Sequence, residues 1–240
     1  MTDTSLLQSR AADRLWRRQA LLAGALYLYI VVAGVVSEAF VRGALIDYQD
    51  AAGTARAILG QTMLYRAGFS LEMVMHLCDL GLAVLLYRLL KPQGPALSLF
   101  AAVLRLMVGA VAAVRALLLA APLVLLDAPN GMDALSGPQR EALALLALRM
   151  HGQAYDIALV FFGVALLALA VLLARSPRFS PLLGAMIGFA GVCYLLNSFA
   201  GFLAPPLQSA MFPFILLPCL VAETVLAIWL VALGVRRSDP

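Results

Sequence analysis

Residues 150–182, MHGQAYDIALVFFGVALLALAVLLARSPRFSPL, decide the fold. The apolar run from 150 to 174 exceeds the roughly 20 residues that an α-helix needs to cross a bilayer. It ends at Arg175, and a short turn with Pro177 leads to Pro181, where the next apolar run begins. A proline cannot continue the preceding helix but fits the first turn of the next one. This stretch therefore predicts two antiparallel transmembrane helices joined by a tight turn.

Further runs of the same kind occupy most of the chain. The fold class that they predict is all-α: a polytopic membrane protein with six transmembrane helices in a bundle. The predicted spans are residues 19–40, 67–87, 95–126, 150–174, 181–204 and 212–235. We divide the chain into a basic N-terminal segment (1–18), the transmembrane domain (19–235) and a short C-terminal tail (236–240).

The composition excludes most other classes of protein. Of the 240 residues, 63% are hydrophobic and 12% are charged, against about 25% charged residues in soluble domains. That is too little polar surface for a cytosolic enzyme, a disordered protein or a nucleic-acid-binding domain. We therefore expect the lipid bilayer, and no nucleic acid, as a partner. The three cysteines, Cys78, Cys193 and Cys219, have no metal-binding or disulfide spacing, and we interpret them as small buried hydrophobes.

The cationic residues near the span ends predict the orientation, because Lys and Arg are enriched in cytoplasmic loops. One side carries Arg10, Arg14, Arg17, Arg18, Arg88, Lys91, Arg175, Arg178, Arg236 and Arg237, and the other carries Arg42, Arg56, Arg66, Arg140 and Arg149. This asymmetry predicts a multi-pass protein of the cell inner membrane with both termini in the cytoplasm.

The connections on the other side are long enough for structure of their own. Residues 43–66 predict a short surface helix. Ser136 is a plausible N-cap, with Pro138 just inside a helix that runs straight into the span at 150–174 and protrudes from the bilayer. The N-terminal segment, with Trp16 among arginines, predicts either an interfacial helix or a frayed tail.

Ionisable and polar side chains inside the spans are the candidate functional residues, because such groups are costly in a bilayer and need partners. The candidates for an interior polar cluster or ligand site are Glu38, Glu72, His76, Asp79, Arg115, His151, Tyr155, Asp156, Tyr194, Asn197 and Glu223. Counting the rise along each helix places most of them between the midplane and the outer surface.

The helical periodicity adds detail to this cluster. Glu72, His76 and Asp79 are spaced i, i+4, i+7 and share one stripe, which must face the bundle interior. His151 and Asp156 are separated by about 140° and therefore lie on different faces of their helix. Arg115 could pair with a carboxylate, that of Glu72, Asp79 or Asp156, and merely hold the bundle together.

Three functional interpretations compete with that structural role. The leading one is a protein that binds or translocates a small solute, a proton or a lipid ligand through a polar interior. The alternative is a metal-dependent intramembrane hydrolase of a lipid or peptide, with His76, Asp79, His151 and Asp156 as candidate ligands for a divalent metal. A haem held by His76 and His151 is the third. The sequence has no HExxH or CxxCH motif, so we predict no cofactor, and it leaves open whether the protein is an enzyme.

Several segments resemble a bacterial integral membrane family, the domain of unknown function 4386. The resemblance covers roughly residues 20–235 and rests on VVSEAFVR (35–42), LCDLGLAVLLYRLLKP (77–92), RMHGQAYDIALVFFGVALLALAVLLARS (149–176) and SPLLGAMIGFAGVCYLLNS (180–198). It implies that the family's recurring positions are Glu38, Arg42, Asp79, His151, Arg175, Pro181, Gly184, Tyr194, Asn197 and Ser198. These segments are not catalytic signatures, and His76 matches none of the positions, so the resemblance implies a family and no reaction.

Overall fold

The structure is a computed structural model that describes residues 3–127 and 134–235, and within these ranges every regular element is a helix. The predicted C-terminal tail, 236–240, lies outside the described residues. The α-helices are α1 (Asp3–Val36), α2 (Gly43–Leu45), α3 (Ala51–Gly60), α4 (Thr62–Leu90), α5 (Pro95–Leu125), α6 (Gly137–Arg175), α7 (Pro181–Leu203), α8 (Pro205–Met211) and α9 (Leu217–Val235). A π-helical segment, Ser37–Arg42, joins α1 to α2, and short 3-10 turns at Lys91–Gln93 and Phe214–Leu216 follow α4 and precede α9.

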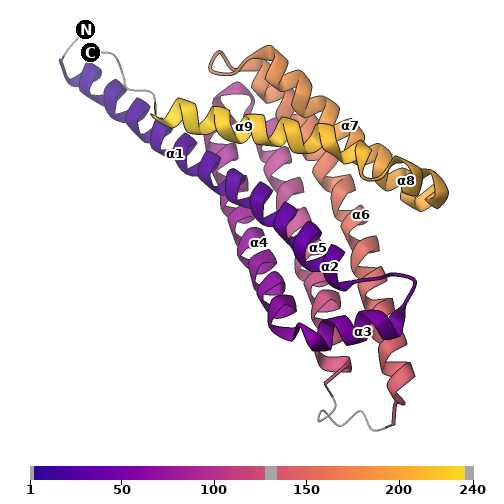
Figure 1. Cartoon of the computed structure of the whole chain (residues 1–240). Coiled ribbons are helices and arrows are strands. Elements are labelled where there is room, and N and C mark those ends of the chain that lie inside the picture. The colour runs from indigo at the N-terminus through magenta and orange to yellow at the C-terminus, as the bar shows by residue number, and fades with distance from the viewer. Residues whose placement is uncertain (1–2, 128–133, 236–240) are drawn as a thin grey trace.

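Six of these helices are long and apolar enough to cross a membrane, which confirms the predicted fold class. They are α1, α4, α5, α6, α7 and α9. They contact one another in chain order, and α9 closes the ring against α1. In Figure 1, α4, α5 and α6 run steeply, whereas α9 crosses them at a wide angle.

The bundle has two distinct ends. The terminal end contains the start of α1, the end of α9, and the tight turns between α4 and α5 and between α6 and α7 (Figure 1). At the distal end, α3 lies across the bundle and the N-terminal part of α6 projects. The even number of spans places the beginning of α1 and the end of α9 together, as the predicted topology requires.

The basic N-terminal segment continues into the first span as one helix. α1 runs unbroken from Asp3 to Val36, so in its described part the segment is helical and not a frayed tail. Trp16 fixes it to the bundle: its indole Nε1 donates to the Leu89 carbonyl at 3.4 Å. The Arg178 guanidinium lies 4.0 Å from the centre of the Trp16 ring, a cation–π contact from the α6–α7 turn.

Both predicted helices at the distal end are present. α3 begins after Asp50, whose carboxylate accepts from the Gly53 amide at 2.8 Å as an N-cap. α6 begins after Ser136, whose backbone amide donates to the Gln139 side chain at 2.8 Å, and Pro138 lies in the first turn as predicted. α6 then continues without a break to Arg175, so this one helix links the distal projection to the terminal end.

Glycine permits a close helix contact between α6 and α7. A Cβ atom at Gly163 would lie 2.9 Å from the Gly191 carbonyl oxygen, and one at Gly191 would lie 2.7 Å from the Gly163 oxygen. These distances are too short for any larger residue, so the two backbones touch, as small residues in membrane helices allow. This contact fixes α7 against the middle of α6.

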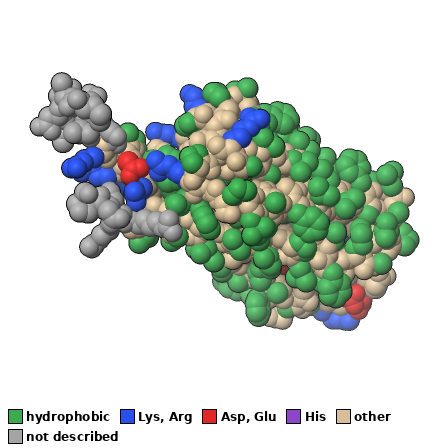
Figure 2. All heavy atoms as spheres, turned by 90° about the horizontal axis from the view of Figure 1, so that it is seen from above, with side chains coloured by type: hydrophobic (Ala, Val, Ile, Leu, Met, Phe, Trp, Pro, Cys, Tyr) green, Lys and Arg blue, Asp and Glu red, His purple; other side chains and the backbone are tan. Residues whose placement is uncertain are grey.

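The outer surface suits a lipid environment. Large apolar side chains are exposed along every span, including Leu77 at 68%, Leu117 at 72% and Leu182 at 69%. Figure 2 shows the molecule from the terminal end: hydrophobic side chains are spread over this face, and charged ones are confined to a few places, one of them near the termini. The protein is therefore a multi-pass membrane protein.

Candidate functional site

The interior polar side chains fall into three clusters, each joined by contacts of its own. The central cluster comprises Tyr27, Asp79, Arg105, Phe162, Tyr194 and Glu223. The distal cluster comprises Ser37, Glu38, Arg42, Glu72, His76, Arg115, His151 and Tyr155. The α7–α8 cluster comprises Asp156, Asn197 and Gln208.

The clusters lie at two depths. At about 1.5 Å per residue, Arg105 lies about 15 Å and Arg115 about 30 Å from Pro95 at the terminal end of α5. On α4, Asp79 and Glu72 lie about 17 Å and 27 Å from Leu90. A bilayer has a hydrocarbon core about 30 Å thick. With the hydrocarbon core taken to begin at Pro95, the central cluster is near mid-bilayer, and the distal cluster is near the level where the distal headgroups begin. Asp156 of the α7–α8 cluster, about 28 Å from Arg175 along α6, lies at a similar distal level.

In the central cluster, an arginine is paired with a carboxylate. Arg105 donates to Asp79 Oδ1 from both Nε, at 2.9 Å, and Nη2, at 2.6 Å. The guanidinium is also sandwiched between aromatic rings, 5.1 Å from that of Tyr27 and 4.9 Å from that of Phe162. Arg105 is 4% exposed, so its charge is fully enclosed by these partners.

The second carboxylate of the central cluster is held by two phenols. Glu223 accepts from the Tyr27 hydroxyl at 2.9 Å and from the Tyr194 hydroxyl at 2.6 Å, one on each oxygen. The Tyr194 ring packs on that of Phe162, with centroids 5.3 Å apart. These contacts connect α1, α6, α7 and α9 in the middle of the bundle. Each charged group here has a strong partner, which is the pattern of a structural core.

The distal cluster contains a paired half. Arg42, at the end of the π-helical segment, bonds Glu38 through Nη2 at 2.6 Å and Nε at 2.9 Å, and it also forms an ion pair with Glu72. The Ser37 hydroxyl donates to Glu72 at 2.7 Å. One guanidinium thus joins two carboxylates, of which Glu72 is buried and Glu38 is exposed.

The other half of the distal cluster is Arg115 with His151. The two residues are joined twice: Arg115 Nη2 lies 2.7 Å from His151 Nε2, and His151 Nδ1 lies 3.0 Å from the Arg115 carbonyl oxygen. A guanidinium only donates and a carbonyl only accepts, so the imidazole is neutral, with its proton on Nδ1. His151 therefore orients Arg115 but does not neutralise it.

Arg115 pairs with none of the three carboxylates that we considered for it. Glu72 is bound by Arg42 and Asp79 by Arg105, while Asp156 faces α7 and α8. Arg115 is buried, with 6% of the residue exposed, and its Nε has no hydrogen-bond partner among the described residues. The like-charged Arg42 lies close enough to repel it. Arg115 is consequently a buried cation without a counter-ion in the described parts of the chain.

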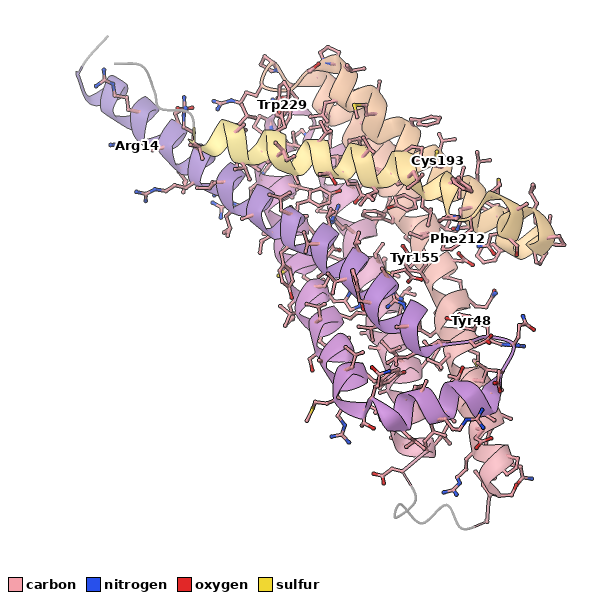
Figure 3. All side chains as sticks on the ribbon, viewed as in Figure 1. Arg14, Tyr48, Tyr155, Cys193, Phe212 and Trp229 are labelled. Atoms are coloured by element: carbon pink, nitrogen blue, oxygen red, sulfur yellow. The ribbon has the colours of Figure 1, made fainter. Side chains whose placement is uncertain are left out.

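Two further side chains border Arg115. The Nε2 atom of His76, on α4, is buried without a described hydrogen-bond partner, and Arg115 lies within its electrostatic range. The Tyr155 ring lies 4.8 Å from the Arg115 guanidinium carbon, yet Tyr155 is 37% exposed. Figure 3 shows Tyr155 on α6, with Phe212 higher and Tyr48 lower in this view. The Tyr155 ring therefore covers one side of the guanidinium and is itself partly exposed.

The α7–α8 cluster contains a carboxylate without a cation. Asp156 is 7% exposed and accepts from two neutral amides, Asn197 Nδ2 at 3.2 Å and Gln208 Nε2 at 3.0 Å. The predicted separation of His151 and Asp156 on different faces of α6 is confirmed, because His151 contacts α5 whereas Asp156 contacts α7 and α8. The residues that the sequence analysis grouped into one cluster are therefore separated, because His151 and Asp156 lie on different faces of α6.

The candidate metal ligands do not gather at one point in the described structure. Within residues 3–127 and 134–235, no three His, Cys, Asp or Glu side chains gather in a way that would hold a metal ion. Both ring nitrogens of His151 are engaged by Arg115. The four residues that we predicted as metal ligands are distributed over three clusters.

Six residues of these clusters were absent from the predicted candidate site: Tyr27, Ser37, Arg42, Arg105, Phe162 and Gln208. Arg105 is in the middle of a span and is the partner of Asp79; its depth, equal to that of Asp79, was the available signal. In the sequence, Tyr27 looks like an ordinary aromatic residue of a mostly apolar run, and only its hydroxyl group is polar. Gln208 follows two prolines in what seemed to be a connection, and only the return of α8 brings it to Asp156.

Comparison with known proteins identifies one family. The family described as "Domain of unknown function (DUF4386)" matches residues 22–234, nearly the whole transmembrane region. Neither the curated proteins nor the solved structures give a match.

Proposed function

The chain belongs to the family called domain of unknown function 4386, and from its own geometry we propose that it binds the anionic group of a small amphiphilic ligand at Arg115. The anion is a carboxylate or a phosphate, the two groups that a guanidinium recognises best. The family description supplies no activity. The proposal therefore rests on the residues of this chain.

The observation that carries the proposal is the charge of Arg115. A charge buried without a partner costs several kcal/mol, and ionisable groups inside membrane helices are therefore paired or functional. The second buried arginine of α5 follows the rule, because Arg105 is bound to Asp79. Arg115 has only a neutral imidazole and an aromatic ring. An incoming anion would supply the missing counter-charge.

The surroundings of Arg115 support an anion at this position. Its Nε–H is a free donor, and the unpartnered His76 Nε2 lies on the neighbouring helix. His151 holds the guanidinium in one orientation through two contacts. Arg42 adds positive potential, although Glu38 and Glu72 offset it. The result is a fixed donor set, which lowers the cost of ordering on binding.

The depth of Arg115 supports an amphiphile. It lies about 30 Å from the terminal end of α5, where the hydrocarbon core meets the headgroups. Phe40, in the π-helical segment that carries Glu38 and Arg42 of the distal cluster, is 66% exposed. A ligand with a charged head and an apolar tail would place the head at Arg115 and the tail against the exposed apolar surface of the bundle. Tyr155 would turn aside to admit the head.

We also propose the cell inner membrane as the location, with the terminal end in the cytoplasm. The cationic residues of the described terminal end, such as Arg14, Arg88, Lys91 and Arg175, outnumber those of the distal end, in accord with the positive-inside tendency. The Arg115 site would then lie in the outer leaflet.

The proposal is tested by comparing amphiphiles that share a dodecyl chain and differ in the head. We expect dodecanoate or dodecyl phosphate to raise the melting temperature of the purified protein in a non-ionic detergent by about 3–5 °C at ten times the dissociation constant. Dodecanol and dodecyltrimethylammonium should have no such effect, because neither head can neutralise Arg115. Comparing the two anions distinguishes a fatty-acid carboxylate from a lipid phosphate.

Either of two results would refute the proposal. Equal shifts with dodecanoate and dodecanol would mean that only the chain is recognised. The absence of a shift with both anions, at concentrations that leave the micelle intact, would mean that the site binds no amphiphilic anion.

A further inference from the structure

We infer that the break between α7 and α8 is a second ligand site, specific for a monovalent cation such as Na⁺. It is separate from the Arg115 site, because Asp156 and His151 lie on different faces of α6. The inference does not depend on the proposed anion ligand, and its test uses a different probe.

The first element of the site is the Asp156 carboxylate. It is buried, and none of the ion pairs among the described residues includes it. Its two hydrogen bonds come from the neutral amides of Asn197 and Gln208, one to each oxygen. These bonds orient the carboxylate, and neither donor carries a charge that would balance it in its ionised form. A cation is what this environment lacks.

The second element is an unused acceptor beside that charge. Asn197 is 3% exposed and donates its Nδ2 to Asp156, while its Oδ1 has no partner in the described ranges. A buried acceptor without a donor costs about 1–3 kcal/mol. The Asn197 carbonyl oxygen and the Asp156 carboxylate belong to side chains that are hydrogen-bonded to each other. One cation could therefore contact both.

The third element is the C-terminus of α7. The carbonyls of Gly201 and Phe202 would accept from the amides four residues later, but these positions are Pro205 and Pro206, which have no N–H. The amide of Leu207 bonds the Ala204 carbonyl instead. Within the described ranges, these two carbonyls therefore lack their usual i+4 amide partners at the negative end of the helix dipole. In membrane proteins, such interrupted helix ends coordinate Na⁺ or protons.

The chain brings these elements together through Gly201. It lies one turn after Asn197 on the same face of α7, and a Cβ atom there would lie 2.8 Å from the Gln208 side-chain amide. Glycine thus lets Gln208, on α8, reach back to Asp156. The two prolines set the turn that makes this return possible.

The charge of the ligand follows from the donors. The site offers one carboxylate, with the remaining oxygens neutral, so a single positive charge balances it. Divalent Ca²⁺ usually takes six to eight oxygens that include several carboxylates, which this site lacks. Oxygen donors of this kind suit a small alkali ion.

We propose to measure the melting temperature of the full chain in detergent at constant ionic strength, with NaCl replaced stepwise by choline chloride. Na⁺ is expected to raise the melting temperature by about 3–5 °C in a saturable manner, at ten times its dissociation constant. A KCl series reports selectivity for ion size.

Three variants locate the effect. Asp156→Asn should abolish the Na⁺ response, and Glu141→Gln, on the same helix but outside the cluster, should retain it. Gly201→Ala displaces the Gln208 amide without removing a charge, and it should weaken the apparent Na⁺ affinity at least several-fold; it serves where Asp156→Asn fails to fold. Identical melting temperatures in NaCl and choline chloride would overturn the inference, as would a Na⁺ response that survives in Asp156→Asn or is unchanged in Gly201→Ala.

Discussion

Replacing Asp79 by leucine is expected to lower the free energy of unfolding by about 3–5 kcal/mol, because the buried Arg105 would lose its counter-ion. Arg105 is 4% exposed and donates two hydrogen bonds to Asp79. Its remaining contacts are aromatic rings, which cannot replace a carboxylate. Unfolding by sodium dodecyl sulfate in mixed micelles would measure the loss.

The double variant Asp79→Leu/Arg105→Leu separates the pair from its surroundings. With both charges removed, most of the lost stability should return, since an apolar pair often replaces a buried ion pair at little cost. A single Asp79→Leu variant with the stability of the wild type would contradict the pairing. The pairing would also be contradicted if the double variant lost more free energy of unfolding than the two single variants, Asp79→Leu and Arg105→Leu, lose together.

The opposite result is expected for Arg115. Replacing Arg115 by methionine should raise the free energy of unfolding of the ligand-free protein by about 1–3 kcal/mol, because an unpaired buried charge is removed. The loss of the His151 hydrogen bond offsets part of this gain, at about 1 kcal/mol. Arg105→Met, on the same helix and equally buried, is the matched control and should destabilise the protein.

The contrast between the two arginines separates structure from function. A residue kept for binding weakens the unliganded protein, whereas a residue kept for structure stabilises it. Should Arg115→Met destabilise the ligand-free protein as much as Arg105→Met does, Arg115 would be a structural residue. Thermal melting of both variants without added amphiphile decides between these results.

The fold followed from the sequence because its signals are local. Apolar run length predicted the six spans, Ser136 and Pro138 predicted the start of α6, and the rotation between His151 and Asp156 predicted their separation. Each of these depends on one helix. The N-terminal segment was harder, since its attachment depends on Trp16 reaching Leu89 on another helix.

The partners of the polar side chains did not follow from the sequence, because they depend on which helices are neighbours. The stripe of Glu72 and Asp79 faces inward, but its two carboxylates are about 10 Å apart along α4 and bind different arginines. Depth counting placed most candidates in one layer; the helix bounds place them in two. Gln208 depends on the return of α8 after two prolines, which no periodicity reveals.

Binding of dodecanoate and dodecyl phosphate by wild type and Arg115→Gln, measured by isothermal titration calorimetry in a non-ionic detergent, tests the central claim most directly. Arg56→Gln, which removes an exposed arginine on α3 at the same end of the bundle, is the control. Since hydrogen bonds to charged groups contribute about 1.5–3 kcal/mol, the account predicts that Arg115→Gln weakens binding of the preferred anion at least about tenfold. Arg56→Gln should bind it as the wild type does. Equal affinity in wild type and Arg115→Gln would contradict the account.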